Sequence, residues 1–167
     1  MAPVHVRPAL QITLVSLGSY LCGYYFTGLF HRPSAALGGL WALISGIVVL
    51  QVDWRGTLSS AWLRVLGTLV GAIVSALYLW FLPFDPLGMA GCIFATVLLC
   101  HAVGIPDPAR LAAVTVALIM VIHTLDPSVS PIVSAALRFS ESFLGAAVAV
   151  LAVRLWPASR AVAGGPA

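Results

Sequence analysis

Long apolar stretches follow one another along almost the whole chain, separated only by short polar breaks. Each approaches the roughly 20 residues that an α-helix needs to cross a hydrocarbon core of about 30 Å. A soluble domain typically carries about 25% charged residues, whereas this chain has 8%, with 61% hydrophobic residues. The pattern predicts an all-α polytopic membrane protein with six transmembrane helices, near residues 9–30, 35–52, 57–82, 87–104, 110–125 and 132–156.

Prolines stand at the joints between these stretches, as expected of residues that start or break helices. Examples are Pro8, Pro33 and Pro131, and no proline is expected in the middle of a span. The first stretch is about twice as long as the apolar region of a signal peptide, so we expect a retained helix. We divide the chain into a six-helix transmembrane domain over residues 1–157 and a short flexible tail over residues 158–167.

With six spans, both termini lie on one side of the membrane, and the arginines indicate which side. Arg32 and Arg138 fall on the side opposite the termini. The side of the termini carries the other basic residues, Arg7, Arg55, Arg64, Arg110, Arg154 and Arg160. By the positive-inside rule, both termini are expected in the cytoplasm. The expected location is the bacterial inner (cytoplasmic) membrane.

A short motif recurs in the third and sixth predicted helices. Arg64 precedes Gly71 by the same interval as Arg138 precedes Gly145, and an alanine follows each glycine. The same offset pairs helices one to three with helices four to six. Because each unit has an odd number of spans, the second unit must be inverted across the membrane. We therefore predict two inverted three-helix repeats, a plan in which transporters hold substrate between the repeats near the midplane.

Small and polar residues line one face of each of these two helices. The faces comprise Ser60, Arg64, Gly67, Thr68, Gly71 and Ser75 on the third helix, and Ser134, Arg138, Glu141, Ser142 and Gly145 on the sixth. A charge in lipid costs about 2.5 kcal/mol or more at the bilayer centre, so both faces should point into the bundle or a wet cavity. The residues predicted to bind substrate are Arg64, Thr68, Ser75, Arg138 and Ser142. The glycines predicted to allow close helix packing are Gly67, Gly71 and Gly145.

Arg64 and Arg138, each about two turns into its helix, can form an electropositive site for an anion. Other roles stay open. Arg138 can pair with Glu141, three residues later, and Arg64 can extend toward the cytoplasmic headgroups or bind carbonyls of a neighbouring helix. Glu141, His101 and His123 are candidates for proton coupling, although the histidines can instead be structural hydrogen-bonding residues.

The sequence offers little support for other functions. The formal charge of +3 is scattered, which excludes the clustered basic face that nucleic acid requires. No metal-ligand spacing, nucleophile motif or phosphate-binding loop occurs, so we expect no metal, no cofactor and no enzymatic activity. Cys22, Cys92 and Cys100 lie in apolar stretches and are expected to behave as small buried hydrophobes.

Residues 41–51 (WALISGIVVLQ) and 56–68 (GTLSSAWLRVLGT) carry a Trp-Ala opening, a Gly-Thr-Leu step and an Arg-x-x-Gly-Thr motif. Together with residues 138–157, they resemble the fusaric-acid-resistance and aromatic-acid-exporter superfamily, whose relatives include the plant aluminium-activated malate channels. The resemblance implies a six-helix membrane domain that moves small organic anions, often aromatic or dicarboxylic acids, and in the plant channels a dimeric pore. Gln51 departs from the acidic residue that the channel branch often has there.

We therefore expect a transporter or channel for small organic anions in the lipid bilayer, working in export. We also expect a homodimer, because six short helices with small-residue faces pack solidly and hardly enclose a wide path. The alternative is a non-transporting membrane subunit or scaffold that assembles with another membrane protein.

Overall fold

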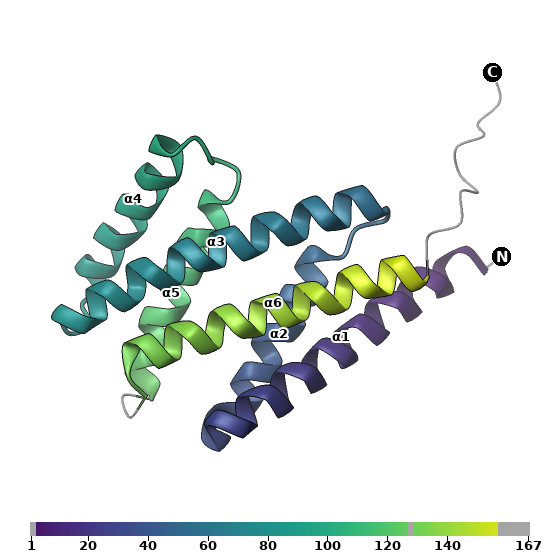
Figure 1. The fold of residues 1–167 in the computed structure, drawn as a ribbon, viewed down its shortest axis with the longest axis horizontal. Helices are drawn as coiled ribbons and strands as arrows, with labels where there is room; N and C mark the ends of the chain where they lie inside the picture. The colour runs from purple at the N-terminus through teal and green to yellow at the C-terminus, as the bar shows by residue number, and fades with distance from the viewer. Residues whose placement is uncertain (1–2, 127–128, 157–167) are drawn as a thin grey trace.

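The computed structural model describes residues 3–126 and 129–156, which form a bundle of long helices (Figure 1). The elements in chain order are α1 (Pro3–Phe30), the 3-10 turn η1 (Arg32–Ser34), α2 (Ala35–Val49), α3 (Trp54–Phe81), α4 (Pro86–Ala102), α5 (Ala109–Leu125) and α6 (Pro131–Leu155). Apart from the start of α1, the helix ends lie within about three residues of the predicted ones. The all-α fold is confirmed.

The first helix starts earlier than the prolines predict. The prediction that Pro8 marks its beginning is wrong, because α1 starts at Pro3 and Pro8 lies inside it. The first four N–H groups of any helix have no intrahelical partner. Pro8 is the sixth residue of α1, so its missing N–H removes only one bond from the helix.

Side-chain caps define the starts of three helices. Asp53 accepts a hydrogen bond from the N–H of Gly56 at the start of α3, and Asp85 accepts one from Gly88 at the start of α4. Ser130 caps α6 in the same way. Each cap satisfies one of the free N–H groups of its helix.

Helices α3 and α6 lie side by side and run in opposite directions, as the colour gradient in Figure 1 shows. Helix α6 also packs on the α1–α2 pair, and α3 packs on α5, which pairs with α4. Helices α3 and α6 therefore form the central seam of the bundle, between one helix pair on each side.

Small residues let the helices of the α1–α2 pair approach closely. A methyl group added to Gly23 would lie 2.6 Å from Cβ of Ala42, and one added to Gly46 would overlap the hydroxyl of Ser19. These positions recur every four residues on each helix, which is the small-residue spacing of tightly packed membrane helices. Where α6 packs on α2, Gly145 of α6 lies against the carbonyl of Ala42.

The α3–α5 contact uses the predicted packing glycines of α3. A methyl group at Gly67 would lie 2.8 Å from Cβ of Leu111, and one at Gly71 would lie 2.7 Å from Cβ of Thr115. Because such distances are too short for real side-chain contacts, only glycine permits this helix separation.

Three helical segments in the described part of the chain are long and apolar enough to cross a membrane: Arg32–Val49, Trp54–Phe81 and Pro131–Leu155. Helices α4 and α5 are apolar but have 17 residues each, or about 26 Å at 1.5 Å per residue. Helix α1 has 28 residues but is less apolar. The chain is thus a membrane protein, and its six-span topology remains a prediction.

Candidate functional site

The polar faces of α3 and α6 lie inside the bundle. Arg64 and Arg138 each expose only 2% of their surface, and Thr68, Glu141 and Ser142 are fully buried. The expectation that these faces avoid lipid is confirmed. The physical reason is the cost of exposing a charge to hydrocarbon, which packing against the neighbouring helices removes.

Arg64 lies deeper in its helix than the sequence predicts. It follows Trp54, the first residue of α3, by ten residues, which is about 15 Å along the helix axis. That is nearly three turns and roughly half the thickness of a hydrocarbon core. A side chain at this depth cannot easily reach the headgroups, which weakens the alternative that Arg64 extends to the membrane surface.

Arg64 binds to α2. Its Nε donates a hydrogen bond of 3.2 Å to the hydroxyl of Ser45, and its guanidinium carbon lies 5.6 Å from the centre of the Trp41 ring. The ring position allows a cation–π interaction. No carboxylate among the described residues lies within ion-pair distance of Arg64. Its positive charge is therefore held by neutral groups only.

Ser142 is the acceptor at the centre of the same network. Its hydroxyl oxygen accepts hydrogen bonds from Trp41 Nε1 at 2.6 Å and from the Ser45 hydroxyl at 3.2 Å. The network therefore joins α2, α3 and α6 through a guanidinium, an indole and two hydroxyl groups, and its described residues include no negative group.

A second buried cluster lies on α6, one turn away, and this one is charge-balanced. Arg138 Nη1 is 3.0 Å from Glu141 Oε2, although this contact lacks the direction of a hydrogen bond. The other carboxylate oxygen, Oε1, accepts a hydrogen bond of 2.5 Å from the Thr27 hydroxyl of α1. Gly38 of α2 packs against the same carboxylate, since a methyl group there would lie 2.6 Å from Oε1.

Two buried donors near the seam have no partner among the described residues: the Thr68 hydroxyl and Arg138 Nε. Unpaired polar groups in an apolar interior are costly, and they commonly mark a position that water or a ligand occupies. Both belong to residues that the sequence predicts to bind substrate. Each can donate a hydrogen bond to an anion.

The remaining predicted site residues lie apart from this seam network. The Ser75 hydroxyl donates to the carbonyl of Gly71 in its own helix, at 2.7 Å. His101 is exposed at the end of α4, where its Nδ1 is 2.8 Å from the carbonyl oxygen of Val97. His123 Nδ1 is buried near the end of α5 and has no hydrogen-bond partner among the residues that the structure describes. Of the three candidates for proton coupling, only Glu141 contacts the buried clusters.

Four residues of these clusters come from α1 and α2 and are not predicted by the sequence: Thr27, Gly38, Trp41 and Ser45. The last three recur at spacings of three and four residues, which places them on one face of α2. That spacing is a usable signal, but nothing in the sequence says that this face meets α6.

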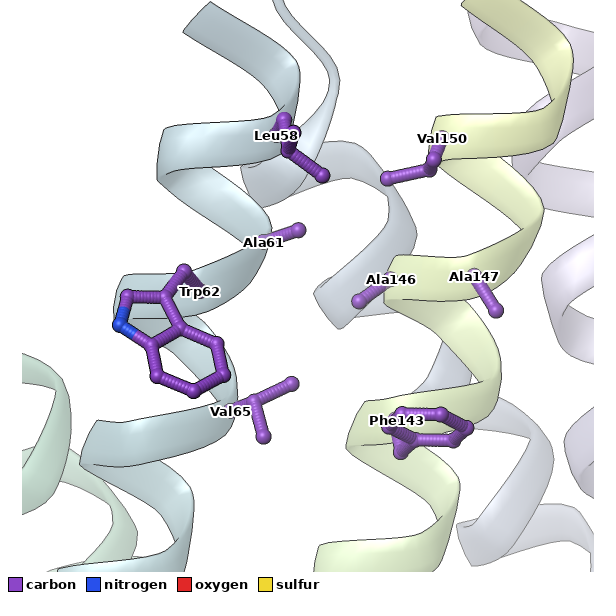
Figure 2. Close-up of a pocket in the computed structure, with 8 residues that line it drawn as sticks. All are labelled: Leu58, Ala61, Trp62, Val65, Phe143, Ala146, Ala147 and Val150. Carbon is purple, nitrogen blue, oxygen red and sulfur yellow. The ribbon is translucent and has the colours of Figure 1, made fainter. Parts of the chain in front are cut away.

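An apolar groove of about 520 Å³ lies on the neighbouring face of the α3–α6 seam (Figure 2). Trp62 and Val65 of α3 face Phe143 of α6 across it, and Ala61 and Ala146 lie between the two helices. The groove holds no charged side chain, so it is not suited to bind an anion. The polar network and the apolar groove therefore occupy different sides of the two central helices.

The described residues contain no group of three or more His, Cys, Asp or Glu side chains that could hold a metal ion. Cys92 and Cys100 are buried, whereas Cys22 is exposed on α1. The prediction that all three are buried is therefore wrong for Cys22, because its side of α1 is not covered by the described part of the chain.

A family model described as fusaric acid resistance protein-like matches residues 21–152, which include α2 to α5 in full, most of α6 and the last third of α1. No curated protein and no solved structure matches the chain. The matched region contains both buried clusters, two of the three segments of membrane-spanning length in full, and most of the third. The family is one of membrane transport rather than of catalysis, and the chain belongs to it as a membrane transport protein.

Proposed function

We propose that the protein exports small organic anions, such as aromatic or dicarboxylic acids, across the bacterial inner membrane. The observation that supports this proposal is that Arg64 is buried without a counter-charge. Its side chain is 2% exposed, lies on a helix of membrane-spanning length, and has no carboxylate partner among the described residues. An uncompensated charge in an apolar interior is costly. A carboxylate passing through the seam would relieve that cost, and this is the substrate class we assign.

The groups around Arg64 suit an anion. The Ser142 and Thr68 hydroxyls are buried, and the Thr68 hydroxyl has no hydrogen-bond partner in the part of the chain described. Arg138 contributes less charge because Glu141 lies 3.0 Å from it. The proposed substrate site is therefore centred on Arg64 with Thr68 and Ser142, and the Arg138 cluster lies at its edge.

The proposed frame is six spans in two inverted repeats, with both termini in the cytoplasm. The helix pairings support it: α1 pairs with α2 as α4 pairs with α5, and α2 packs on α6 as α5 packs on α3. Buried positions also repeat at the interval that separates Arg64 from Arg138, as in Ala35 with Ala109 and Gly38 with Ala112. Two related halves meeting at the seam would place Arg64 between the repeats.

We further propose that the working unit is a homodimer. The helices of a single chain are closely packed, since Gly145 of α6 contacts the backbone of α2 directly. Close packing leaves little room for a substrate path within one chain. Mass measurement in nanodiscs tests the assembly, and a fully active monomer would exclude it.

The function is tested by efflux from proteoliposomes loaded in turn with a panel of aromatic and dicarboxylic acids. We expect at least one acid to leave faster than from protein-free vesicles, with a neutral amide of the same acid retained. If no acid moves through protein shown to be folded and inserted, the proposal fails and the alternative of a non-transporting subunit is favoured.

A further inference from the structure

A second cavity lies where α4 turns into α5. It has a volume of about 550 Å³, within the usual range for small-molecule sites. Three of its lining residues are polar, His101, Asp107 and Arg110, and Val97 and Leu111 are among the apolar ones. A cavity with one basic, one acidic and one imidazole group beside apolar walls differs in kind from the apolar groove of Figure 2.

The loop that forms this cavity is held in one conformation. Gly104 has a φ of 77°, which few other residues adopt without strain. The N–H of Gly104 donates to the carbonyl of His101, and that of Ile105 donates to the carbonyl of Cys100. This is the Schellman arrangement that ends helices. Pro108 is buried next to Gly67 of α3, so the cavity is built on a fixed turn.

The polar groups of the cavity are free to bind a ligand. Arg110 has no ion-pair partner among the described residues, although Asp107 lies three residues before it. His101 Nδ1 must carry the hydrogen, because it lies 2.8 Å from the carbonyl oxygen of Val97, which only accepts. In the neutral ring, the remaining nitrogen, Nε2, is then an acceptor. The cavity thus offers one cation and two acceptors.

The cavity opens at the edge of the apolar surface. Leu98 and Val103, on the same end of α4, expose 53% and 64% of their surface, whereas Asp107 and Arg110 are exposed polar residues just beyond them. In a membrane protein this boundary lies at the level of the lipid headgroups.

We propose that this cavity binds the headgroup of a phospholipid that carries a primary ammonium, as phosphatidylethanolamine does. Arg110 pairs with the phosphate, while Asp107 and His101 Nε2 accept hydrogen bonds from the ammonium. Val97 and Leu111 contact the start of the acyl chains. A purely anionic headgroup would leave Asp107 facing a like charge, which is why we assign a zwitterionic one.

The test uses the full chain in nanodiscs that contain equal amounts of phosphatidylethanolamine and phosphatidylcholine. Retained lipids are counted by native mass spectrometry. Phosphatidylcholine keeps the phosphate, but its quaternary ammonium has no hydrogen to donate. We expect the wild type to retain phosphatidylethanolamine in preference, Asp107→Asn to lose that preference, and Arg110→Gln to retain about fivefold less of both lipids. Arg55→Gln, at an exposed arginine outside the cavity, is the matched control.

Equal retention of the two lipids by the wild type would overturn the proposal, as would an Arg55→Gln loss equal to that of Arg110→Gln. A second arm adds soluble phosphoethanolamine or inorganic phosphate to lipid-free protein in detergent and records the thermal shift. The same thermal shift is recorded with phosphatidylethanolamine. If a soluble compound raises the melting temperature as much as this lipid does, and Arg110→Gln abolishes the rise, the cavity binds a soluble phosphate compound instead. None of these readouts depends on anion transport, so the result is separable from the proposed function.

Discussion

Arg138 Nη1 lies 3.0 Å from Glu141 Oε2 inside the bundle, with both side chains almost fully buried. The two charges cancel locally, and the second carboxylate oxygen is satisfied by Thr27. Arg64, at the corresponding position of α3, has no such counter-charge among the described residues. The buried charged side chains described on these two helices therefore carry one net positive charge, and it belongs to Arg64.

Arg64→Glu should lower the initial rate of acid efflux by about tenfold or more, equivalent to about 1.4 kcal/mol of barrier. The change reverses the sign of a buried charge that has no counter-charge among the described residues, and so repels the anion. Efflux is measured in proteoliposomes with matched protein content. Arg55→Glu, on the exposed start of the same helix, should leave the rate unchanged, and wild-type rates for Arg64→Glu would contradict the assignment.

Arg138→Ala should mainly lower stability, by about 3–5 kcal/mol, because it leaves Glu141 buried without a counter-charge. The double variant Arg138→Ala with Glu141→Ala should recover much of that loss. Unfolding is followed by circular dichroism in mixed micelles at increasing denaturing detergent. A double variant no more stable than Arg138→Ala alone would show that the pair does not act as a unit.

Gly38→Ala should destabilise the α1–α2–α6 contact. The added methyl group would overlap the Thr27 hydroxyl and lie 2.6 Å from Glu141 Oε1, so one helix must shift. We expect a loss of about 1–3 kcal/mol, typical of overpacking. Gly91→Ala is the control, since nothing lies within 4 Å of its added methyl group. Equal melting temperatures for the two variants would argue against a tight contact at Gly38.

The six-span topology predicts which loops are reached from which side. In a background without native cysteines, single cysteines at Asp53 and Asp107 should react with an impermeant thiol reagent only from the cytoplasmic side. Cysteines at Leu82 and Val129 should react only from the opposite side. Intact and inverted vesicles provide the two measurements. Labelling of the Asp53 and Leu82 positions from the same side would mean that α3 does not span the membrane.

Much of the helical framework could be predicted from the sequence. Span length and proline placement located all six helices, because lipid forces every backbone group to bond within its own helix. The inward face of α3 was predictable from the cost of exposing Arg64 to hydrocarbon. The spacing of Arg138 and Glu141 allows an ion pair between them. In the structure the two side chains form this pair, so Arg138 is not free.

The partners of these faces could not be predicted. Ser45 and Trp41 reach Ser142 and Arg64 only because α2 packs on α6 and also contacts α3. Thr27 reaches Glu141 only because α1 packs on α6 as well. Periodicity tells which side of a helix turns inward, but not which helix it meets.

The sequence by itself determined that the chain is helical, that it belongs in a membrane, and that two arginine-bearing faces are hidden from lipid. Each follows from a local cost, that of an unpaired backbone group or of an exposed charge. Only the tertiary structure decided that Arg138 is neutralised while Arg64 is not, and that α1 and α2 complete both clusters. These depend on close contacts between residues far apart in the chain, which the shapes of the packed helices select, because hydrocarbon does not distinguish one apolar face from another.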